Sequence, residues 1–311
     1  MKAIYFNGKE AEYRQDYKMP EPTETESLVK IELAAICNTD KEILKGYKPD
    51  FTGVMGHEFI GVVVTSPDPS LVGERVAGEL NAGCGKCKYC RSGLSKHCNS
   101  RRVIGIEKKD GCFAEYMTIE TDLLHVVPDG LCAEHAIFTE PLAAALEIPS
   151  LIHIDPDKKI AVLGDGRLAL MIAQVIALTG ASLTVTGRHE DKLALFSSFA
   201  DVTTQIVPEG YDIVIDATGS KSGILTATQM VKKRGTIIIK STYAGKVELD
   251  MSYYVVNEIT ITGSRCGPFE PTLNLLKKGY VTFPDIETYD LSEFKKAFSS
   301  NAFKSGFDFR K

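Results

Sequence analysis

The run KIAVLGDGRLALMIAQVIA, residues 159–177, decides the fold of its half of the chain. An apolar strand-like segment leads into two glycines one residue apart, and a helix-forming segment follows. In such a setting the first glycine permits a tight turn, and the second lets the backbone approach a pyrophosphate at a helix N-terminus. We therefore predict a dinucleotide site at Gly164 and Gly166, with the amides of Arg167 and Leu168 directed at phosphate.

Strand-like and helix-like segments alternate around this run. Residues 142–147 and 168–177 favour helices, and continuous apolar runs occur at 159–163, 182–186, 212–216 and 235–239. Continuous apolar strands are typical of a sheet that is buried on both faces. The alternation predicts a doubly wound parallel sheet over roughly residues 145–268.

The end of the segment 182–186 bears on the choice of cofactor. NAD-specific sites of this kind carry an acid there, whereas this chain has Gly187 and Arg188, with Lys192 one turn on. A glycine leaves room, and a guanidinium group suits a 2′-phosphate. The pattern favours NADP(H) over NAD(H), although Arg188 could instead be a solvated charge or stack on adenine.

A second informative stretch is MGHEF, residues 55–59, in which a histidine and a glutamate stand side by side in an apolar run. Together with Cys37 upstream and Glu140 downstream, His57 and Glu58 supply the thiolate, imidazole and carboxylates that a catalytic zinc takes. An isolated Gly-His-Glu is more often a turn with two surface residues, so the hypothesis depends on the other motifs.

Four of the eight cysteines form a C-x2-C-x2-C-x7-C cluster. These residues are Cys84, Cys87, Cys90 and Cys98. Four thiolates close a tetrahedral shell, which suits a structural zinc that folds a loop; a disulfide pair is the alternative. Loss of one ligand should unfold this lobe locally. We interpret Cys112, Cys132 and Cys266 as small buried hydrophobic residues.

The rest of the chain shows a different pattern of apolar residues. Short apolar runs bounded by Gly and Pro occur at 2–6, 28–33, 59–64 and 74–79. Their spacing predicts a small irregular β-barrel. The tail from Pro268 mixes a helix near residues 271–278 with aromatic segments, and we expect it to pack back on the barrel.

Length and composition agree with this division. A chain of 311 residues exceeds the usual range of a single core, and 44% hydrophobic with 25% charged residues is ordinary for a globular protein. The net charge of -5 offers no basic footprint for nucleic acid or anionic lipid. We find neither a tract of 18 apolar residues nor a secretory h-region, so we expect a cytoplasmic protein with reduced cysteines.

In combination, the motifs resemble those of the zinc-dependent medium-chain dehydrogenases, the family of alcohol, sorbitol and threonine dehydrogenases. The likeness covers nearly the whole chain. It rests on Cys37-x-Thr39-Asp40, Gly56-His57-Glu58, the four-cysteine cluster, Thr139-Glu140-Pro141-Leu142, the glycine fingerprint and Asp216-Ala217-Thr218-Gly219. The resemblance implies an α/β protein in which a GroES-like β-barrel catalytic domain, 1–144 and 269–311, is interrupted by a Rossmann domain, 145–268. The active site would lie in the cleft between them.

The resemblance also implies roles around a catalytic zinc ion. Cys37 and His57 would be ligands, and Glu58 would be a direct ligand or one that exchanges with water. Glu140 would be the third protein ligand, as in the sorbitol and threonine branches. Asp40 would hydrogen-bond His57 and set its tautomer, although a cap of the following helix is an alternative role. The four-cysteine cluster would hold a second, structural zinc ion.

Zinc would lower the pKa of a substrate hydroxyl, and a hydride would pass between the substrate carbon and the nicotinamide. Thr39 is placed to accept the hydroxyl proton and pass it on. Glu42 stands where many relatives carry the outer histidine of a proton relay; it is either a relay carboxylate or an exposed helix charge. We assign Lys240 and Ser264 to the cofactor side of the site. We also hypothesise that Lys240 or Arg265 meets an anionic or heavily hydroxylated substrate.

We therefore predict a zinc-dependent oxidoreductase that interconverts an alcohol and a carbonyl compound with NAD(P). A polyol, sugar alcohol or sugar phosphate is the favoured substrate, and a threonine-type amino alcohol or a carbonyl compound reduced by NADPH is the alternative. The ligand residues argue against a non-catalytic NADPH-binding protein, and the net charge argues against a zinc ribbon for nucleic acid. We expect a homodimer or homotetramer with neither a nucleic acid nor a membrane as partner.

Overall fold

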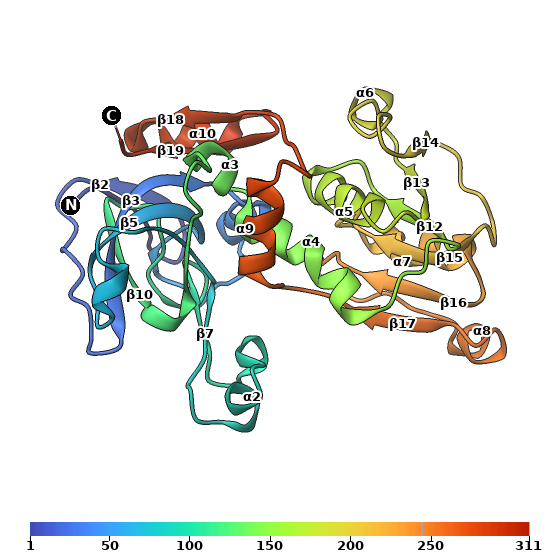
Figure 1. Cartoon of the computed structure of the whole chain (residues 1–311), viewed down its shortest axis with the longest axis horizontal. Coiled ribbons are helices and arrows are strands. Elements are labelled where there is room, and N and C mark those ends of the chain that lie inside the picture. The colour runs from blue at the N-terminus through green and yellow to red at the C-terminus, as the bar shows by residue number, and fades with distance from the viewer. Residues whose placement is uncertain (244, 311) are drawn as a thin grey trace. The chain divides into compact units, whose positions relative to one another are not determined.

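The computed structural model describes residues 1–243 and 245–310 (Figure 1). The chain forms two compact units, Met1–Glu140 with Phe269–Lys311, and Pro141–Pro268. The second unit is an insertion in the first, and the tail belongs to the unit in which the chain begins. Within the described ranges, no helix is both long and apolar enough to cross a membrane.

The first unit is built mainly from antiparallel strands. Its largest sheet has the order β11-β6-β5-β3-β19-β18, with β10 paired to β3, and a smaller sheet has the order β2-β1-β4. The strands of these sheets are β1 (Ala3–Phe6), β2 (Ala11–Arg14), β3 (Glu26–Ala35), β4 (Gly53–Val54), β5 (Glu58–Thr65), β6 (Arg75–Gly78), β10 (Tyr116–Glu120), β11 (Leu124–Val126), β18 (Ile286–Tyr289) and β19 (Lys304–Asp308). The helices and 3₁₀ turns around them are α1 (Asn38–Leu44), η1 (Pro69–Leu71), η3 (Thr121–Leu123), α3 (Ala133–Ala136), α9 (Phe269–Lys277), η4 (Leu291–Glu293) and α10 (Phe294–Ser299).

Strand β3 organises the part of this unit that carries the metal-ligand candidates. Its end pairs with the beginning of β5 through Ala35 and Glu58. On its other side, Ala35 pairs with Gly306 of β19. Both pairings are antiparallel, so the beginnings of β5 and β19 flank the end of β3. Residues distant in sequence are thereby brought together at the same end of three neighbouring strands.

The loop that enters β5 requires a glycine at position 56. Gly56 has φ +91°, and a Cβ atom built on it would lie 2.3 Å from Cδ1 of Phe113. An L-residue side chain would meet both backbone strain and an aromatic ring at this point. The turn places His57 directly before β5.

The segment 81–109, which we call the cysteine lobe, contains only short elements. These are β7 (Asn81–Ala82), α2 (Lys88–Arg91), η2 (Ser95–His97), β8 (Arg102–Ile104) and β9 (Lys108–Lys109), with the three strands in the order β7-β8-β9. Helices of four and three residues are too short to be stable by themselves. The lobe therefore needs another source of stability, such as a bound metal ion.

The second unit contains a parallel sheet with the order β14-β13-β12-β15-β16-β17. Its strands are β12 (Lys159–Leu163), β13 (Ser182–Thr186), β14 (Asp201–Thr203), β15 (Tyr211–Asp216), β16 (Val231–Ile239) and β17 (Thr260–Gly263). The helices are α4 (Thr139–Leu151), which begins in the first unit, α5 (Arg167–Ala177), α6 (Glu190–Leu193), α7 (Lys221–Met230) and α8 (Met251–Val256). In chain order the strands follow the 3-2-1-4-5-6 pattern of dinucleotide-binding sheets. The predicted doubly wound sheet is confirmed.

Both faces of this sheet are buried. Ala161 and Leu163 of β12 pack in one apolar cluster with Ile224 of α7. The alternate residues Ile160 and Val162 point to the opposite face and are fully buried as well. Burial on both faces explains why these strands are continuously apolar.

Candidate active site

Three of the predicted metal ligands meet in the first unit. Cys37 follows β3, His57 precedes β5 and Glu58 begins β5. One donor atom from each residue lies within 4.8 Å of the others, and His57 and Glu58 are 3% and 1% exposed. A thiolate, an imidazole and a carboxylate at this spacing form a donor set that fits zinc.

Asp40 contacts two members of this group. Its Oδ2 atom accepts a hydrogen bond of 2.8 Å from the amide of Cys37, which caps α1, and its Oδ1 atom lies 3.4 Å from Nδ1 of His57. The sequence left two alternatives for Asp40, a helix cap or a partner of His57. One carboxylate makes both contacts.

The electrostatics of this group favour a positive charge. Burial is the largest single influence on His57 and lowers its pKa, but the negative charge of Asp40, together with Cys37, raises the pKa well above its usual range. A site that stabilises a proton on a fully buried imidazole has an excess of negative partners. Such a site is suited to a bound cation.

Lys304 is a member of this neighbourhood that we did not predict. It begins β19, is 3% exposed, and forms an ion pair through Nζ with Oε2 of Glu58. The sequence carries no local signal for this pairing, because it depends on β19 and β5 flanking the same end of β3.

Three other predicted residues lie around α1 and α4. Thr39 Oγ1 lies 3.7 Å from the sulfur of Cys37. Glu42 forms an exposed ion pair of 2.9 Å with Lys45. Glu140 is the second residue of α4 and is not in the group whose donor atoms lie within 4.8 Å of one another. The roles of these residues stay predictions.

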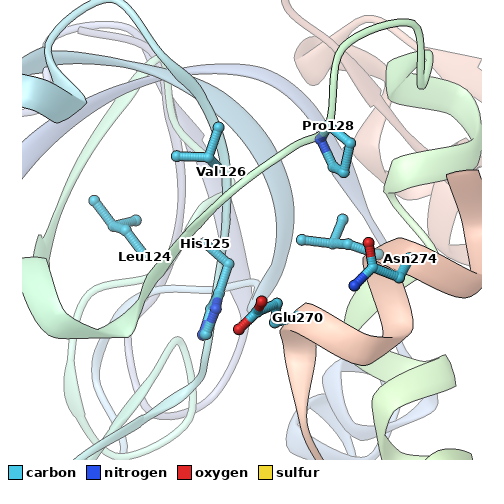
Figure 2. A pocket seen from close by; sticks show the side chains of 7 residues that line it. Leu124, His125, Val126, Pro128, Glu270 and Asn274 are labelled. Carbon is cyan, nitrogen blue, oxygen red and sulfur yellow. The ribbon is translucent and has the colours of Figure 1, made fainter.

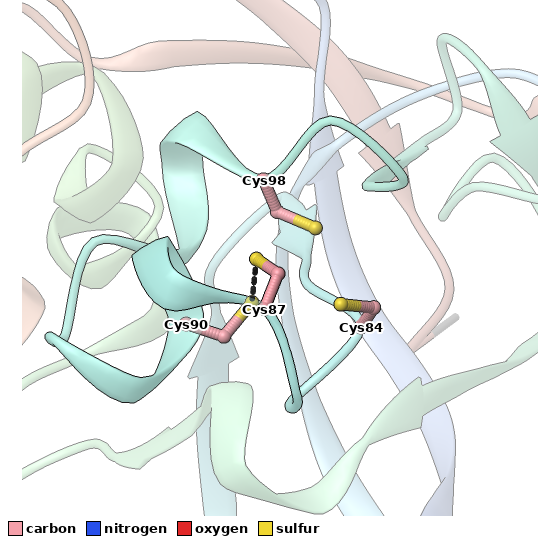
Figure 3. A group of neighbouring side chains, drawn as sticks. All are labelled: Cys84, Cys87, Cys90 and Cys98. Atoms are coloured by element: carbon pink, nitrogen blue, oxygen red, sulfur yellow. Dashed lines mark hydrogen bonds between the residues drawn. The ribbon is translucent and has the colours of Figure 1, made fainter.

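The cysteine lobe brings its four predicted ligands together. The sulfurs of Cys84, Cys87, Cys90 and Cys98 all lie within 4.8 Å of one another. Figure 3 shows the four side chains gathered at one place in the lobe. The Cys87 and Cys90 sulfurs are 3.6 Å apart, and all eight cysteines of the chain are free thiols. Two sulfurs each about 2.3 Å from one zinc at the tetrahedral angle would be roughly 3.8 Å apart. The cluster fits a four-thiolate zinc site.

Hydrogen bonds from backbone amides favour the thiolate form of two of these cysteines. The amides of Lys86 and Cys87 lower the pKa of Cys84 to about 6, and the amide of Cys90 lowers the pKa of Cys87. Burial and the Cys87 thiol raise the pKa of Cys90 to about 11. Amide groups that stabilise thiolates are the environment in which thiols bind metals.

The glycine fingerprint lies at the carboxyl edge of the parallel sheet. Gly164 has φ +127°, and a Cβ atom there would lie 2.9 Å from the carbonyl oxygen of Ala217. Gly166 is the N-cap of α5, and a Cβ atom on it would meet nothing within 4 Å. The first glycine is required by the turn, whereas the second leaves open space at a helix N-terminus. This arrangement fits the pyrophosphate of a dinucleotide.

The loop after β13 is tied to the fingerprint by Asp165. Its Oδ2 atom accepts hydrogen bonds from the amides of Arg188 at 2.7 Å and His189 at 2.9 Å, and lies 2.9 Å from Nδ1 of His189. Burial raises the pKa of Asp165, but these partners together lower it below the usual range. A Cβ atom on Gly187 would lie 2.7 Å from Cβ of Asp165.

Lys240 lies at the same edge, directly after β16. It is 8% exposed and donates hydrogen bonds to Oγ of Ser264 at 2.9 Å and to the carbonyl oxygen of Arg265 at 2.7 Å. The ammonium group thus holds the segment after β17 in place. Contact of Lys240 or Ser264 with the cofactor stays a prediction.

A separate cavity of about 380 Å³ lies in the first unit (Figure 2). Its lining residues are Leu124, His125, Val126, Pro128, Glu270, Leu273 and Asn274. His125 Nε2 lies 3.0 Å from Oε1 of Glu79, and its ring stacks on Phe269 with centroids 5.2 Å apart. The histidine is satisfied by these neighbours, and none of the predicted site residues lines the cavity.

Comparison with known families explains the combination of barrel, thiol lobe and parallel sheet. Residues 23–129 match the alcohol dehydrogenase GroES-like domain, and residues 168–278 match the zinc-binding dehydrogenase family. The two matches cover more than half of the chain. This chain is a zinc-dependent medium-chain dehydrogenase.

Relatives of this dehydrogenase span nearly its whole length. A D-arabitol-phosphate dehydrogenase of Enterococcus avium is 31% identical over 91% of this chain and 88% of its own length. A sorbitol dehydrogenase of Halalkalibacterium halodurans is 29% identical over 92% of this chain and 91% of its own. The crystal structure of a zinc-binding dehydrogenase from Sinorhizobium meliloti, bound to NADP, has a TM-score of 0.89 and 28% identity, covering 99% of this chain and 98% of that one.

These findings confirm the predicted family, the GroES-like and Rossmann fold, and the prediction of an enzyme. The dehydrogenase is an NAD(P)-dependent alcohol oxidoreductase.

Proposed function

We propose that this dehydrogenase interconverts a secondary hydroxyl group of a polyol or polyol phosphate and the corresponding ketone. The observation that carries the proposal is the buried group of Cys37, His57 and Glu58, a zinc-type donor set in a chain that also has a dinucleotide fingerprint. The D-arabitol-phosphate and sorbitol dehydrogenases among its relatives support the substrate class.

In this proposal Cys37, His57 and Glu58 would hold a catalytic zinc ion, together with Glu140 from the start of α4. The ion supplies a positive charge that lowers the pKa of the substrate hydroxyl. Asp40 fixes the orientation of the His57 ring through Nδ1, which leaves Nε2 free for the metal. Thr39, whose hydroxyl lies 3.7 Å from the Cys37 sulfur, would relay the proton of the substrate hydroxyl, accepting it while passing its own hydroxyl proton on to solvent.

The cysteine lobe holds the second zinc ion, which stabilises the lobe without taking part in the chemistry. NADP(H) is the preferred cofactor, because Arg188 and Lys192 supply positive charge beyond β13 and no acid stands at position 187. The enzyme works as a homodimer or homotetramer, which sedimentation velocity can test.

We propose an anionic or heavily hydroxylated substrate because of two basic residues, Lys240 and Arg265. Both lie on segments at the carboxyl edge of the sheet, where ligands bind in open α/β folds. Replacing each with Ala should raise the KM for a polyol phosphate more than the KM for the unphosphorylated polyol. An equal change in KM for both substrates would show that Lys240 and Arg265 do not bind a substrate phosphate.

A threonine-type amino alcohol is the second candidate substrate. An L-threonine 3-dehydrogenase of Bacillus licheniformis is 27% identical over 90% of this chain and 89% of its own length. The same zinc and hydride chemistry serves both substrates, so the substrate pocket must discriminate between them.

The deciding experiment combines a metal count with substrate profiling. Two zinc ions per chain are expected, and NADP⁺ should be reduced with arabitol, sorbitol, galactitol or their phosphates as substrate. Threonine in the same assay tests the second candidate. A single zinc ion confined to the cysteine lobe, with no turnover of any of these alcohols, would refute the proposed chemistry.

A further inference from the structure

Asp216 is a fully buried acid at the carboxyl end of β15. In the order β14-β13-β12-β15-β16-β17, the direction in which strands are added reverses between β12 and β15. Open α/β sheets bind ligands outside the carboxyl ends of the strands at this switch point. Leu163, which precedes the glycine fingerprint, and Asp216 are paired in register across it. The acid therefore lies beside the predicted dinucleotide site.

One oxygen of this carboxylate binds two loops. Oδ1 of Asp216 accepts hydrogen bonds from the amide of Thr218 at 2.9 Å and from its hydroxyl at 2.8 Å. Oγ of Ser241 lies 3.1 Å from the same oxygen and 3.2 Å from the carbonyl oxygen of Asp216, so its proton is shared between the two acceptors. The same Oγ accepts a 2.7 Å hydrogen bond from the amide of Gly219. Asp216 thus joins the loop after β15 to the loop after β16.

The loop after β15 lies against the turn of the glycine fingerprint. A Cβ atom on Gly164 would lie 2.9 Å from the carbonyl oxygen of Ala217 and 3.3 Å from the amide nitrogen of Thr218. The amide of Ala217 also donates a 2.9 Å hydrogen bond to the carbonyl oxygen of Leu163. Because Asp216 fixes the Thr218 amide, it also fixes the surface against which the fingerprint turn packs.

Stability alone gives little reason for an acid at this position. Asp216 is 0% exposed, and its Oδ2 atom has no hydrogen-bond partner among the residues that the structure describes. A Cβ atom on Gly223 of α7 would lie 2.4 Å from Oδ1 and 2.5 Å from Oδ2, so the helix backbone covers the carboxylate. Burial of a carboxylate with one oxygen unpartnered costs stability. What the acid provides is the fixed arrangement of the loops that its other oxygen binds.

We propose that Asp216 is a positioning residue for the nicotinamide half of the cofactor and acts through Thr218 and Ser241. In a sheet of this order the adenosine half binds on the β13 side of the switch point, and the nicotinamide half binds on the β15 side. Loops that are already ordered bind a ligand without the entropic cost of becoming ordered. The proposal rests on the dinucleotide site and does not depend on whether NADP(H) or NAD(H) is preferred.

Cofactor titration of the whole chain tests the proposal without turnover. Asp216→Ala should weaken the binding of NADPH and NADH, followed by cofactor fluorescence, by about tenfold, the effect of one charge-assisted hydrogen bond. ADP and 2′,5′-ADP lack the nicotinamide half, and their affinities by calorimetry should stay near the wild-type values. Asp216→Asn keeps an oxygen that accepts from Thr218 and should recover most of the lost affinity. Equal losses for the whole cofactors and for the adenine nucleotides would overturn the proposal.

Asp212→Ala is the matched control. Asp212 lies on the same strand, at the amino edge of the sheet. It accepts a 2.8 Å hydrogen bond from the amide of Lys159 and pairs with Lys232 at 3.1 Å. Asp212→Ala should lower the free energy of unfolding without changing the ratio of cofactor affinity to ADP affinity. If this variant and Asp216→Ala change the ratio equally, Asp216 has only a structural role and the proposal is overturned.

Ser241→Ala tests the proposal even if Asp216→Ala does not fold. Ser241 is only partly buried, and its hydroxyl joins the amide of Gly219 to Asp216. Loss of this neutral link should weaken cofactor binding by about fivefold and leave ADP binding near the wild-type value. An unchanged cofactor affinity would overturn the proposal. Failure of the wild type to bind either NADPH or NADH would instead refute the dinucleotide site and, with it, the proposed function.

Discussion

Asp165 Oδ2 accepts a 2.7 Å hydrogen bond from the amide of Arg188. The contact joins the glycine fingerprint to the loop after β13, two segments whose cofactor roles the sequence suggested separately. It also explains Gly187, since a Cβ atom at that position would lie 2.8 Å from the same carboxylate oxygen. Asp165 comes from the loop after β12, and its carboxylate is bound to the amides of Arg188 and His189.

Arg188→Asp should reverse the cofactor preference. A guanidinium group that binds a 2′-phosphate contributes about 1.5–3 kcal/mol, so NADPH affinity should fall roughly tenfold to 100-fold while NADH affinity rises. Fluorescence titration with both cofactors measures the ratio. Arg234→Ala is the control, because Arg234 forms an exposed pair with Glu258 in the same unit. An unchanged ratio in Arg188→Asp would remove this residue from cofactor selection.

Gly187→Ala should destabilise the second unit by about 1–3 kcal/mol, because the new methyl group overlaps Asp165. Denaturant unfolding measures the effect. Gly263→Ala is the control, since a Cβ atom on Gly263 meets nothing within 4 Å. If the overlap is the cause, adding Asp165→Gly, which removes the Cβ atom as well as the carboxylate, should make Gly187→Ala less costly. Additive effects would point to another origin.

Asp165→Asn should lower stability at neutral pH by about 1–3 kcal/mol, because the ionised carboxylate is the acceptor for two amides and faces His189. The pKa of Asp165 is lowered in the folded chain, so its contribution is present above the unfolded value of about 3.9. It is lost as the pH falls through the lower folded value. The free energies of unfolding of the wild type and of Asp165→Asn should therefore converge at acidic pH. A difference between them that does not change with pH would contradict this account.

Cys98→Ser should remove one zinc ion per chain and make the cysteine lobe sensitive to protease. The four sulfurs lie within 4.8 Å of one another, and the lobe has only short elements to stabilise it. Metal analysis and limited proteolysis across residues 84–102 measure the effect. We predicted Cys132 to be buried, but the thiol is exposed, because Cys132 precedes the short surface helix α3; Cys132→Ser should therefore leave both unchanged. A full zinc content in Cys98→Ser would show that the lobe does not bind the metal as a four-thiolate site.

Local sequence patterns accounted for most of the secondary structure in the second unit. Strands β12 and β13 have the expected bounds. A short continuous apolar run between glycines or polar residues is stable as a strand that is buried on both faces of a sheet. Strand β16 begins at Val231 rather than at the expected Gly235, since Val231 pairs with Tyr211 ahead of a register shift. The short edge strand β14 was not predicted, because its exposed residues carry no hydrophobic signal.

Motifs with fixed spacing were the other part that the sequence determined. The cysteine cluster and the His57-Glu58 pair could be read locally, since ligand chemistry restricts both residue type and spacing. Two pairings were decided only by the tertiary structure. Lys304 forms an ion pair with Glu58, and Asp165 accepts a hydrogen bond from the amide of Arg188. Each joins segments far apart along the chain, and the register between strands, which depends on the packing of the whole sheet, brings them within bonding distance.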